Sequence, residues 1–252
     1  RSGVDAEEID QAVFGNIIHT EPRDMYLSRA VSIAAGVKLD TPALTLNRLC
    51  GSGLQAIISG AQSIMLGDAS TMLVGGAESM SRSPHATRSI RTGHKMGDLA
   101  FTDMLIGVLS DPFDGAHMGV TAENVAKDKG ISRETQDKIA VESHRRAINA
   151  IDKGFFKDQI IPIEVKSRRE TVSFDTDEHP RRDATLHGMA SLRPVFQKDG
   201  SVTAGNASGI NDGAAALVLS ILPPASALGL AADVAGAMGR TGAKPGFVDC
   251  NA

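Results

Sequence analysis

The sequence predicts an α/β fold that is interrupted by an inserted domain. Three observations predict it. An apolar segment, a tight glycine-rich turn and an amphipathic helical pattern follow one another over residues 42–67, and a second apolar segment follows at residues 71–74. Polar and basic stretches then replace this pattern from residue 79 to about residue 203, and an apolar segment returns at residues 214–222. We therefore expect the chain to leave its first domain and to re-enter it.

The elements before this unit are short. Residues 5–9 predict a helical turn, residues 11–18 a strand, and the mixed segment from Pro22 to Gly36 another helix.

The unit at residues 42–74 is the most informative part of the sequence. Residues 42–46 predict a strand and residues 47–53 a tight turn. The next segment, residues 54–67, keeps its apolar residues on one helical face and ends at Gly67, a natural helix stop. Because a second buried strand follows at residues 71–74, we expect a βαβ unit whose two strands pair in parallel.

The insertion is expected to be rich in helices. Its strongest helical pattern runs from Ser132, the expected N-cap, to Gly154. Residues 160–165 predict a strand, with Pro162 favouring an edge, and the charged residues 168–183 predict a loop. Residues 214–222 predict a buried strand or helix. The expected division is 1–78 for the first part of the main domain, 79–203 for the insertion, 204–231 for the return and 232–252 for the start of a second half.

Composition excludes several classes of function. The 252 residues include 26 basic and 30 acidic side chains, a net charge of −4 that gives no attraction to nucleic acid or to an anionic membrane surface. The least polar stretch, residues 214–238, contains two prolines and Asp233, so it does not predict a membrane-spanning helix. The seven histidines lack the spacing of a metal site. We expect a soluble protein with a small ligand, no nucleic acid or membrane partner and no bound metal.

The two cysteines, Cys50 and Cys250, lie far apart in the sequence and do not predict a disulfide-stapled secreted scaffold. A reducing compartment is therefore favoured. The first residues show no signal-peptide core, although the chain begins without a methionine. We expect a cytoplasmic protein, and an organelle matrix is also compatible with the sequence.

Cys50 is the candidate nucleophile. It lies between a predicted strand and an amphipathic helix, where exposed N–H groups and the helix dipole favour a thiolate. The small residues Gly51, Ser52 and Gly53 leave room for a substrate carbonyl, and the N–H of Cys50 could donate to a developing oxyanion. The alternative is a buried cysteine that packs as a small hydrophobic residue. The local pattern alone does not decide between the two.

Four segments resemble thiolases. The sequence LNRLCGSGLQAII at residues 46–58 is very similar to the segment around the acyl-accepting cysteine of that family. GGAESMS at residues 75–81, HMGVTAEN at residues 117–124 and VTAGNASGINDGAAA at residues 202–216 follow in thiolase order and at thiolase-like separations. The resemblance runs from Val4 to about Gly229, and EPRDMY at residues 21–26 is most similar to broad-range bacterial 3-ketothiolases.

The resemblance implies a thiolase-like fold, with a mixed sheet, helices on both of its faces and an inserted loop domain. It also implies an acyltransferase that uses CoA as a substrate, with no tightly bound cofactor. It implies a two-step exchange: the Cys50 thiolate attacks the 3-keto carbon, acetyl-CoA leaves, and a second CoA collects the acyl group. Synthesis from two acetyl-CoA is the reverse. A homodimer or homotetramer is also implied, and the basic residues Arg82, Arg88, Arg91 and Lys95 are candidates for tetramer contacts, although a charged loop is more often solvated.

The same resemblance places a set of CoA contacts in the insertion and just after it. Arg181 is expected to stack on adenine or meet phosphate charge, Ser208 to hydrogen-bond a pantetheine amide, and Met118 to pack against the acyl chain. Taken singly, each has a more common structural explanation, such as a solvated charge or a core side chain. The complete set is Leu109, His117, Met118, Arg181, Phe196, Ala204 and Ser208.

Three thiolase segments are not found whole in this sequence: the Gly-His-Pro segment with the activating histidine, the Gly-rich loop with a second cysteine, and the Asn-Glu-Ala-Phe segment. We therefore expect a partial thiolase with its second half largely missing, which alone is inactive in turnover. The alternative is a non-catalytic acyl-CoA-binding or assembly module. A related condensing enzyme and a cysteine protease are less favoured. Acyl-chain length and reaction direction are not readable from the residues.

Overall fold

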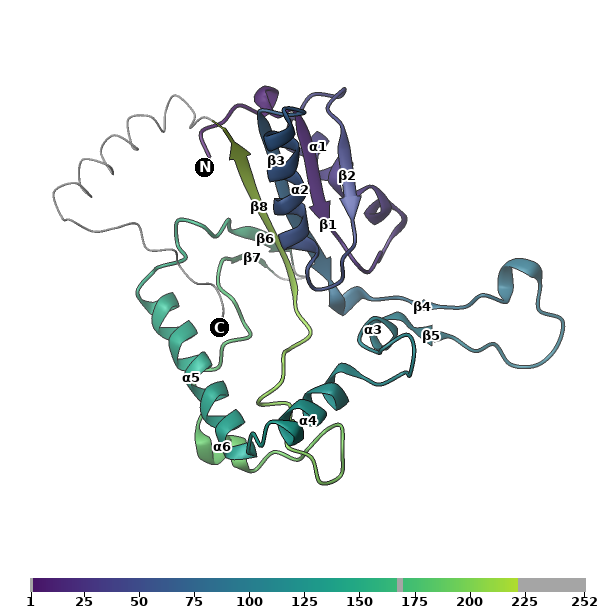
Figure 1. Ribbon diagram of the computed structural model, residues 1–252, viewed down its shortest axis with the longest axis vertical. Helices are drawn as coiled ribbons and strands as arrows, with labels where there is room; N and C mark the ends of the chain where they lie inside the picture. Colours follow the sequence, from purple (N-terminus) through teal and green to yellow (C-terminus); the bar gives the residue numbers. More distant parts are fainter. Residues whose placement is uncertain (1, 167–169, 222–252) are drawn as a thin grey trace. The chain divides into compact units, whose positions relative to one another are not determined.

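The computed structural model describes residues 2–166 and 170–221, which divide into two compact units (Figure 1). Residues 2–83 and 212–221 belong to the first unit, and residues 84–166 and 170–211 to the second. The predicted start of a second half, residues 232–252, lies outside the described residues, as does Cys250. The domain assignment made from the sequence stays a prediction.

The first unit is built on a mixed sheet. Its strands are β1 (Gln11–Gly15), β2 (Ala43–Leu46), β3 (Thr71–Ser79) and β8 (Asp212–Ser220), in the order β2-β1-β3-β8. Strands β2 and β3 both run parallel to β1, and β8 is antiparallel to β3. The expectation that β2 and β3 pair with each other is wrong, because β1 lies between them.

Helices cover both faces of this sheet, as predicted. The helix α2 (Ser52–Leu66) packs on the face of β1 that carries Val13, while α1 (Leu27–Ala34) reaches the other face, where its Ser28 N–H donates to Thr45 Oγ1 on β2 at 3.0 Å. The two faces differ because successive strand residues point to opposite sides. Short 3₁₀ turns, η1 (Ala6–Glu8), η2 (Pro22–Tyr26) and η3 (Met80–Arg82), complete the unit.

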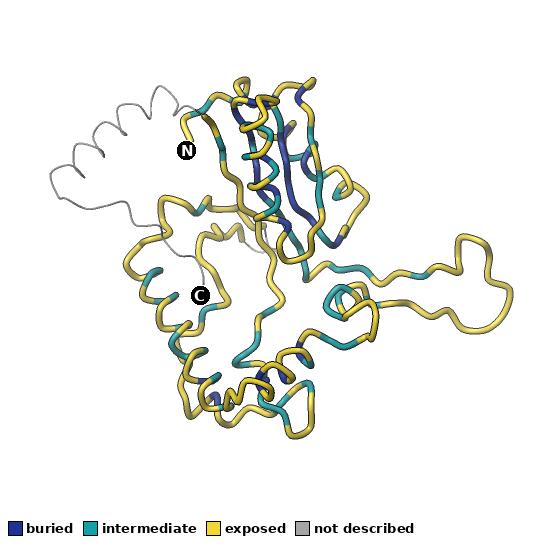
Figure 2. The backbone as a smooth tube through the Cα atoms, in the orientation of Figure 1, coloured by how far each residue is buried: buried dark blue, intermediate teal, exposed yellow. Residues whose placement is uncertain are grey.

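The core of the first unit is small and lies between α2 and the sheet. Val13, Ala56, Ala69, Met72 and Val74 are buried there (Figure 2). On α2 the apolar side chains that reach this core are Ala56, Ile57 and Ile64. The other large apolar residues of the helix are exposed, so its apolar residues do not keep to one buried face. The helix ends at Gly67, whose φ of 81° is the left-handed conformation of a helix stop, as predicted.

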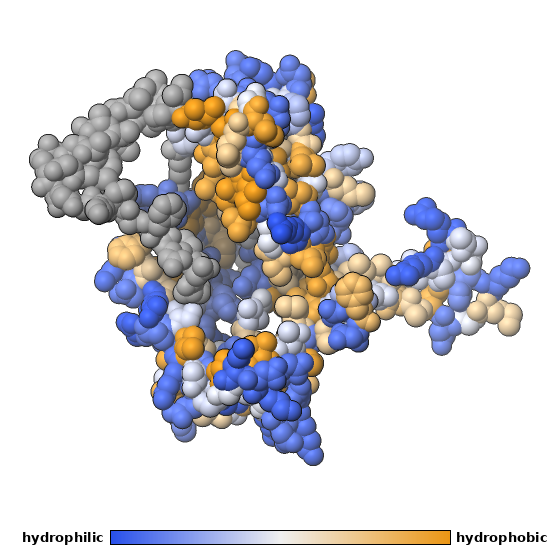
Figure 3. Space-filling view, in the orientation of Figure 1, coloured by the Kyte–Doolittle hydropathy of each residue, from blue (hydrophilic) through white to orange (hydrophobic). Residues whose placement is uncertain are grey.

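The outer face of α2 is apolar and exposed. Leu54, Ile58, Met65 and Leu66 are exposed, and hydrophobic residues gather over this side of the first unit (Figure 3). Residues 49–66 are also apolar and long enough to span a membrane, yet the inner face of α2 packs on the sheet as a core helix does. The strand β8 is also mostly exposed, so the prediction of a buried segment at residues 214–222 is wrong for its described residues.

The second unit is mainly helical. It contains α3 (Met104–Val108), α4 (Met118–Asp128), α5 (Arg133–Asp152) and α6 (Leu186–Ala190), the turn η4 (Ile90–Thr92), and two-stranded pairs formed by β4 (His85–Ala86) with β5 (Thr102–Asp103) and by β6 (Ile163–Lys166) with β7 (Thr171–Phe174).

Two sequence predictions can be compared with the structure of this unit. Ser132 caps α5 as expected, because its side chain accepts a hydrogen bond from Thr135 N–H. The loop predicted at residues 168–183 is wrong where β7 forms. That strand, with the sequence TVSF, has no charged residue and pairs antiparallel with β6, although the segment around it is charged.

Candidate functional site

Cys50 lies in a tight turn between β2 and α2, directly before Gly51, the N-cap residue of the helix. It is exposed and forms no disulfide. The preceding residue, Leu49, has a φ of 48°, a left-handed conformation that costs a leucine about 1–2 kcal/mol. The exposure of Cys50 contradicts the alternative of a buried small hydrophobic residue, and its role as a nucleophile stays a prediction.

Hydrogen bonds within the turn hold this conformation. Ser52 is 2% exposed, and its Oγ accepts the Arg48 N–H at 2.8 Å and donates to the Leu49 carbonyl at 2.6 Å. The side chain of Asn47 accepts the Leu49 N–H at 2.9 Å. Leu49 is thus fixed on both sides of its strained φ, and the position of the Cys50 backbone follows from it.

Glycines on the sheet let the start of α2 approach closely. A Cβ added to Gly15 at the end of β1 would lie 2.7 Å from Ser52 Cβ and 2.8 Å from the Ser52 carbonyl carbon. A Cβ on Gly76 of β3 would lie 3.7 Å from Gly53 Cα. The first approach is possible only because residue 15 is glycine, while the second is an ordinary van der Waals distance. The helix start is therefore seated against the carboxyl ends of two parallel strands, where α/β sheets bind ligands.

The chemistry available at this edge is that of a thiol beside a helix N-terminus. The first N–H groups of a helix have no partner within it, and the dipole is positive there. A Cβ on Gly53 would have no atom within 4 Å, so the surface beside the turn is open. An anionic sulfur and a developing oxyanion both suit this environment.

A partly buried carboxylate, Glu78, orders the chain that follows β1 at the same edge. Glu78 accepts the N–H groups of Ile17 at 2.9 Å and Ile18 at 3.1 Å. Asn16 donates to the Ala77 carbonyl at 2.9 Å, while its buried Oδ1 has no partner among the described residues. Sequence analysis did not single out this pair. A signal was present for Glu78, which follows the strand predicted at residues 71–74, whereas Asn16 lies within the strand predicted at residues 11–18.

Four of the predicted CoA residues come together in the second unit. Leu109 accepts the Met118 N–H at 2.8 Å, and the rings of His117 and Phe196 stack with centroids 4.9 Å apart. His117 is also the N-cap of α4, because its Nδ1 accepts the Gly119 N–H at 3.0 Å. Met118 is exposed. The N-terminus of α4 thus presents a ring pair beside an exposed thioether.

Ala204 and Ser208 lie on the loop that leads to β8, and both are exposed. The backbone on either side of Ala204 is held in place, because Thr203 is fully buried and its N–H donates to Asn206 Oδ1 at 2.7 Å. The exposed positions therefore belong to an ordered loop.

Arg181 has different neighbours from the other predicted CoA residues. Its N–H donates to His144 Nδ1 at 3.2 Å and its guanidinium pairs with Asp183 at 3.1 Å, so its hydrogen bonds within the described chain reach none of the other predicted CoA residues. Arg181 holds the pKa of the Asp183 carboxyl below its ordinary value through these hydrogen bonds. Burial, and then the charges of His179 and Arg181, lower the pKa of His144.

The surface around Arg181 is hollowed. The hollow has a volume of about 430 Å³ and its lining includes His144, Arg145, Arg181 and Arg182. Asp152 offsets part of this charge, because it pairs with Arg182 at 2.7 Å. A surface with three arginines can receive an anionic group such as a phosphate. Among the described residues, no cluster of three histidine, cysteine or acidic side chains could hold a metal ion.

Comparison with known proteins adds independent information. A family model described as the thiolase N-terminal domain matches residues 1–221. The beta-ketothiolase BktB of Cupriavidus necator is 58% identical over 220 residues, which cover 87% of this chain and 56% of that protein. The human mitochondrial 3-ketoacyl-CoA thiolase is 44% identical over 218 residues, 86% of this chain and 55% of that protein.

Solved structures agree. Human mitochondrial 3-ketoacyl-CoA thiolase in complex with CoA is similar with a TM-score of 0.83 and 42% identity, over 91% of this chain and 57% of that one. The acetyl-CoA acetyltransferase of Bacillus anthracis is similar with a TM-score of 0.82 and 39% identity, over 96% and 58%. This chain thus spans little more than half the length of the proteins that it matches.

Proposed function

The chain belongs to the thiolase family, and on that premise we propose that it supplies the acyl-accepting cysteine, Cys50, of a CoA-dependent acyltransferase. The observation that carries the proposal is the placement of Cys50: an exposed thiol beside the N-terminus of α2, after a residue with positive φ. Such a position suits a nucleophile whose sulfur must be both accessible and held in one direction.

The proposed reaction has two steps. The Cys50 thiolate attacks the 3-keto carbon of a 3-ketoacyl-CoA, and the bond between that carbon and carbon 2 breaks. The electron pair leaves with acetyl-CoA, which takes up a proton. The thiol of a second CoA then attacks the Cys50 thioester, loses its proton and releases the shortened acyl-CoA, while the Cys50 sulfur regains its electron pair. Condensation of two acetyl-CoA is the reverse.

The second unit supports a role in binding CoA. The stacked rings of His117 and Phe196 and the exposed Met118 form an apolar surface that suits pantetheine or an acyl chain. Arg181 suits a phosphate group, which would compete with Asp183 for the guanidinium. The solved human relative with bound CoA makes this ligand the natural candidate. Leu109, Ala204 and Ser208 complete the proposed set.

The test uses acetoacetyl-CoA and CoA with the complete protein product, and compares Cys50→Ala with Cys250→Ala. We expect the unchanged protein and the Cys250 variant to form acetyl-CoA and to gain the mass of an acetyl group on the Cys50 peptide. We expect Cys50→Ala to do neither. The chain of residues 1–252 by itself is expected to acquire the acyl group slowly and not to turn over.

Two outcomes would contradict the proposal. Acyl transfer that survives in Cys50→Ala would move the nucleophile elsewhere. Binding of CoA by the unchanged complete protein, without acylation or turnover, would favour a non-catalytic acyl-CoA-binding module instead.

A further inference from the structure

Two buried carboxylates lie beneath the loop that carries Ala204. Glu123 on α4 is 6% exposed and Asp137 on α5 is 4% exposed. Buried carboxylates are uncommon unless hydrogen bonds satisfy them. Both carboxylates accept hydrogen bonds from residues 201–206, a segment that we call the anchored loop.

Glu123 binds the start of the anchored loop. Its two carboxylate oxygens accept the Ser201 N–H at 2.9 and 2.8 Å, its Oε2 accepts the Ser201 hydroxyl at 2.9 Å, and its Oε1 accepts the Val202 N–H at 2.8 Å. A Cβ on Gly200 would collide with the same carboxylate. Burial raises the pKa of Glu123, but the hydrogen bonds from Ser201 and Val202 outweigh it and lower the pKa overall. The loop is therefore bound to an ionised group.

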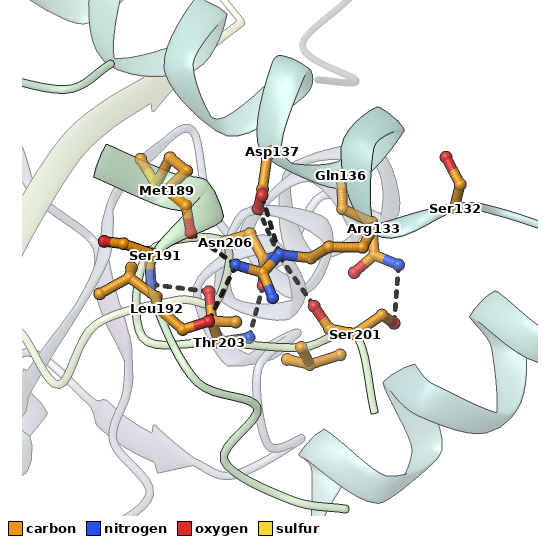
Figure 4. Close-up of polar contacts among 12 residues, drawn as sticks. Ser132, Arg133, Gln136, Asp137, Met189, Ser191, Leu192, Ser201, Thr203 and Asn206 are labelled. Carbon is orange, nitrogen blue, oxygen red and sulfur yellow. Dashed lines mark hydrogen bonds and ion pairs between the residues drawn. The ribbon is translucent and has the colours of Figure 1, made fainter. Parts of the chain in front are cut away.

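Asp137 binds the end of the anchored loop (Figure 4). Its carboxylate accepts Asn206 Nδ2 at 2.9 Å and Arg133 Nε at 2.8 Å. The amide of Asn206 also donates to the Ser201 carbonyl at 3.1 Å and accepts the Thr203 N–H at 2.7 Å. The loop is therefore closed on itself by Asn206. It is tied to α5 by that side chain and by Gln136, whose Nε2 donates to Ser201 Oγ at 2.9 Å.

Arg133 extends this network to a further segment. Its Nη2 donates to the Met189 carbonyl at 2.5 Å and to the Leu192 carbonyl at 3.1 Å. Nε and Nη2 of the guanidinium are thus bound to one carboxylate and two carbonyls of the protein. The role of Arg133 is to hold Asp137 in place.

The helix α4 connects these contacts to the proposed CoA surface. Its first residues are His117 at the N-cap and Met118, and Glu123 follows on the same rigid helix. Phe196, which stacks on His117, precedes the anchored loop by five positions. The carboxylate of Glu123 therefore fixes the anchored loop, with Ala204, relative to the His117 and Phe196 rings.

We propose that Glu123 and Asp137 are positioning residues for CoA, which hold Ala204 and the following Ser208 at a fixed distance from His117 and Met118. This inference rests on the proposed function. The two carboxylates touch the loop rather than the ligand, and act through its backbone. We expect loss of the hydrogen bonds of Glu123, or of those of Asp137, to shift the anchored loop without moving Cys50, whose turn is held by other residues.

The experiment uses the complete protein product with Glu123→Gln, Glu123→Asp and the control Glu134→Gln, an exposed residue of α5 that pairs with Lys138. The amide in Glu123→Gln places an NH₂ donor against N–H donors. We expect the KM for CoA to rise about tenfold while kcat stays within about twofold, because misplaced contacts weaken binding more than chemistry. Glu123→Asp should recover part of the loss, and Glu134→Gln should match the unchanged protein.

Two further measurements separate positioning from folding. Hydrogen exchange in peptides containing Ser201 and Val202 should accelerate in Glu123→Gln, while alkylation of Cys50 by iodoacetamide should keep its rate. A second variant, Asn206→Ala, should raise the KM for CoA about fivefold and so provides the test if Glu123→Gln does not fold.

The outcomes distinguish the two proposals. An unchanged KM in Glu123→Gln, or in Asn206→Ala where that variant alone folds, would overturn the positioning role and leave the acyltransferase proposal intact. Failure of the unchanged protein to bind CoA would overturn the proposed function, and the positioning role with it.

Discussion

The Cys50 turn (residues 47–53) and the anchored loop (residues 201–206) both hold exposed candidate site residues, but with different interactions. The Cys50 turn relies on neutral groups: the Ser52 hydroxyl, the Asn47 amide and the close approach of Gly15. The anchored loop relies on two buried carboxylates. We therefore expect substitutions that fill space to disturb the Cys50 turn, and substitutions that remove charge to disturb the anchored loop.

The difference extends to sequence separation. The side-chain hydrogen bonds of the Cys50 turn join residues no more than seven positions apart, such as Ser52 and Arg48. Glu123 and Ser201 are 78 positions apart, and Asp137 and Asn206 are 69 apart. Cys50 is thus oriented mainly by its own segment, whereas the proposed ligand loop is oriented by helices that lie much earlier in the sequence. Substitutions should therefore act on the two regions in different ways.

The largest expected effect comes from filling the space under the Cys50 turn. Gly15→Ala would place a methyl group 2.8 Å from the Ser52 carbonyl carbon, so the start of α2 must move. We expect the free energy of unfolding in urea to fall by about 3 kcal/mol, as in overpacked cores. The matched control is Gly53→Ala, whose Cβ enters open space. Equal stability of the two variants would show that space does not limit this turn.

A smaller effect is expected from removing charge beneath the anchored loop. Asp137→Asn keeps the shape of the side chain but leaves Arg133 without its ionic partner, and we expect a loss of about 2 kcal/mol in the free energy of unfolding. Asp128→Asn, at an exposed position on α4, is the control. If both substitutions changed stability equally, the contrast between charge and space would not hold.

The smallest effect is expected from Glu142, an accessible carboxylate on the same helix as Asp137. Hydrogen bonds from Arg145 and then Arg146 lower the pKa of Glu142 from 4.5 to about 2. Because the pKa is lowered in the folded state, any stabilisation is fully present above pH 4.5 and is lost as the pH falls through about 2. Carbon-detected NMR titration measures this pKa.

Stability at neutral pH tests whether accessible and buried carboxylates differ in importance. Glu142→Gln should leave the free energy of unfolding unchanged within error at physiological salt, because solvent screens accessible ion pairs. A loss as large as that of Asp137→Asn would mean that burial is not what makes a carboxylate important in this unit.

Local features of the fold were predictable. The helix that begins beside Cys50, its stop at Gly67 and the Ser132 cap follow from spacing and from single residues, since helices close their hydrogen bonds within a few positions. The positions of Cys50, His117 and Ser208 could be named through resemblance, while their roles stay proposals. Neighbouring strands were less predictable: β1 lies between β2 and β3, and β7 forms within a charged segment.

The sequence by itself determined the α/β class, the strand, turn and helix around Cys50, and the family. Each of these depends on continuous runs of residues. Only the tertiary structure decided the strand order, the exposure of β8 and the roles of Glu123 and Asp137. Those features depend on groups that meet after the chain has folded. A carboxylate in a helical pattern has the same sequence signature whether it faces water or a loop 78 positions away, and packing alone makes the choice.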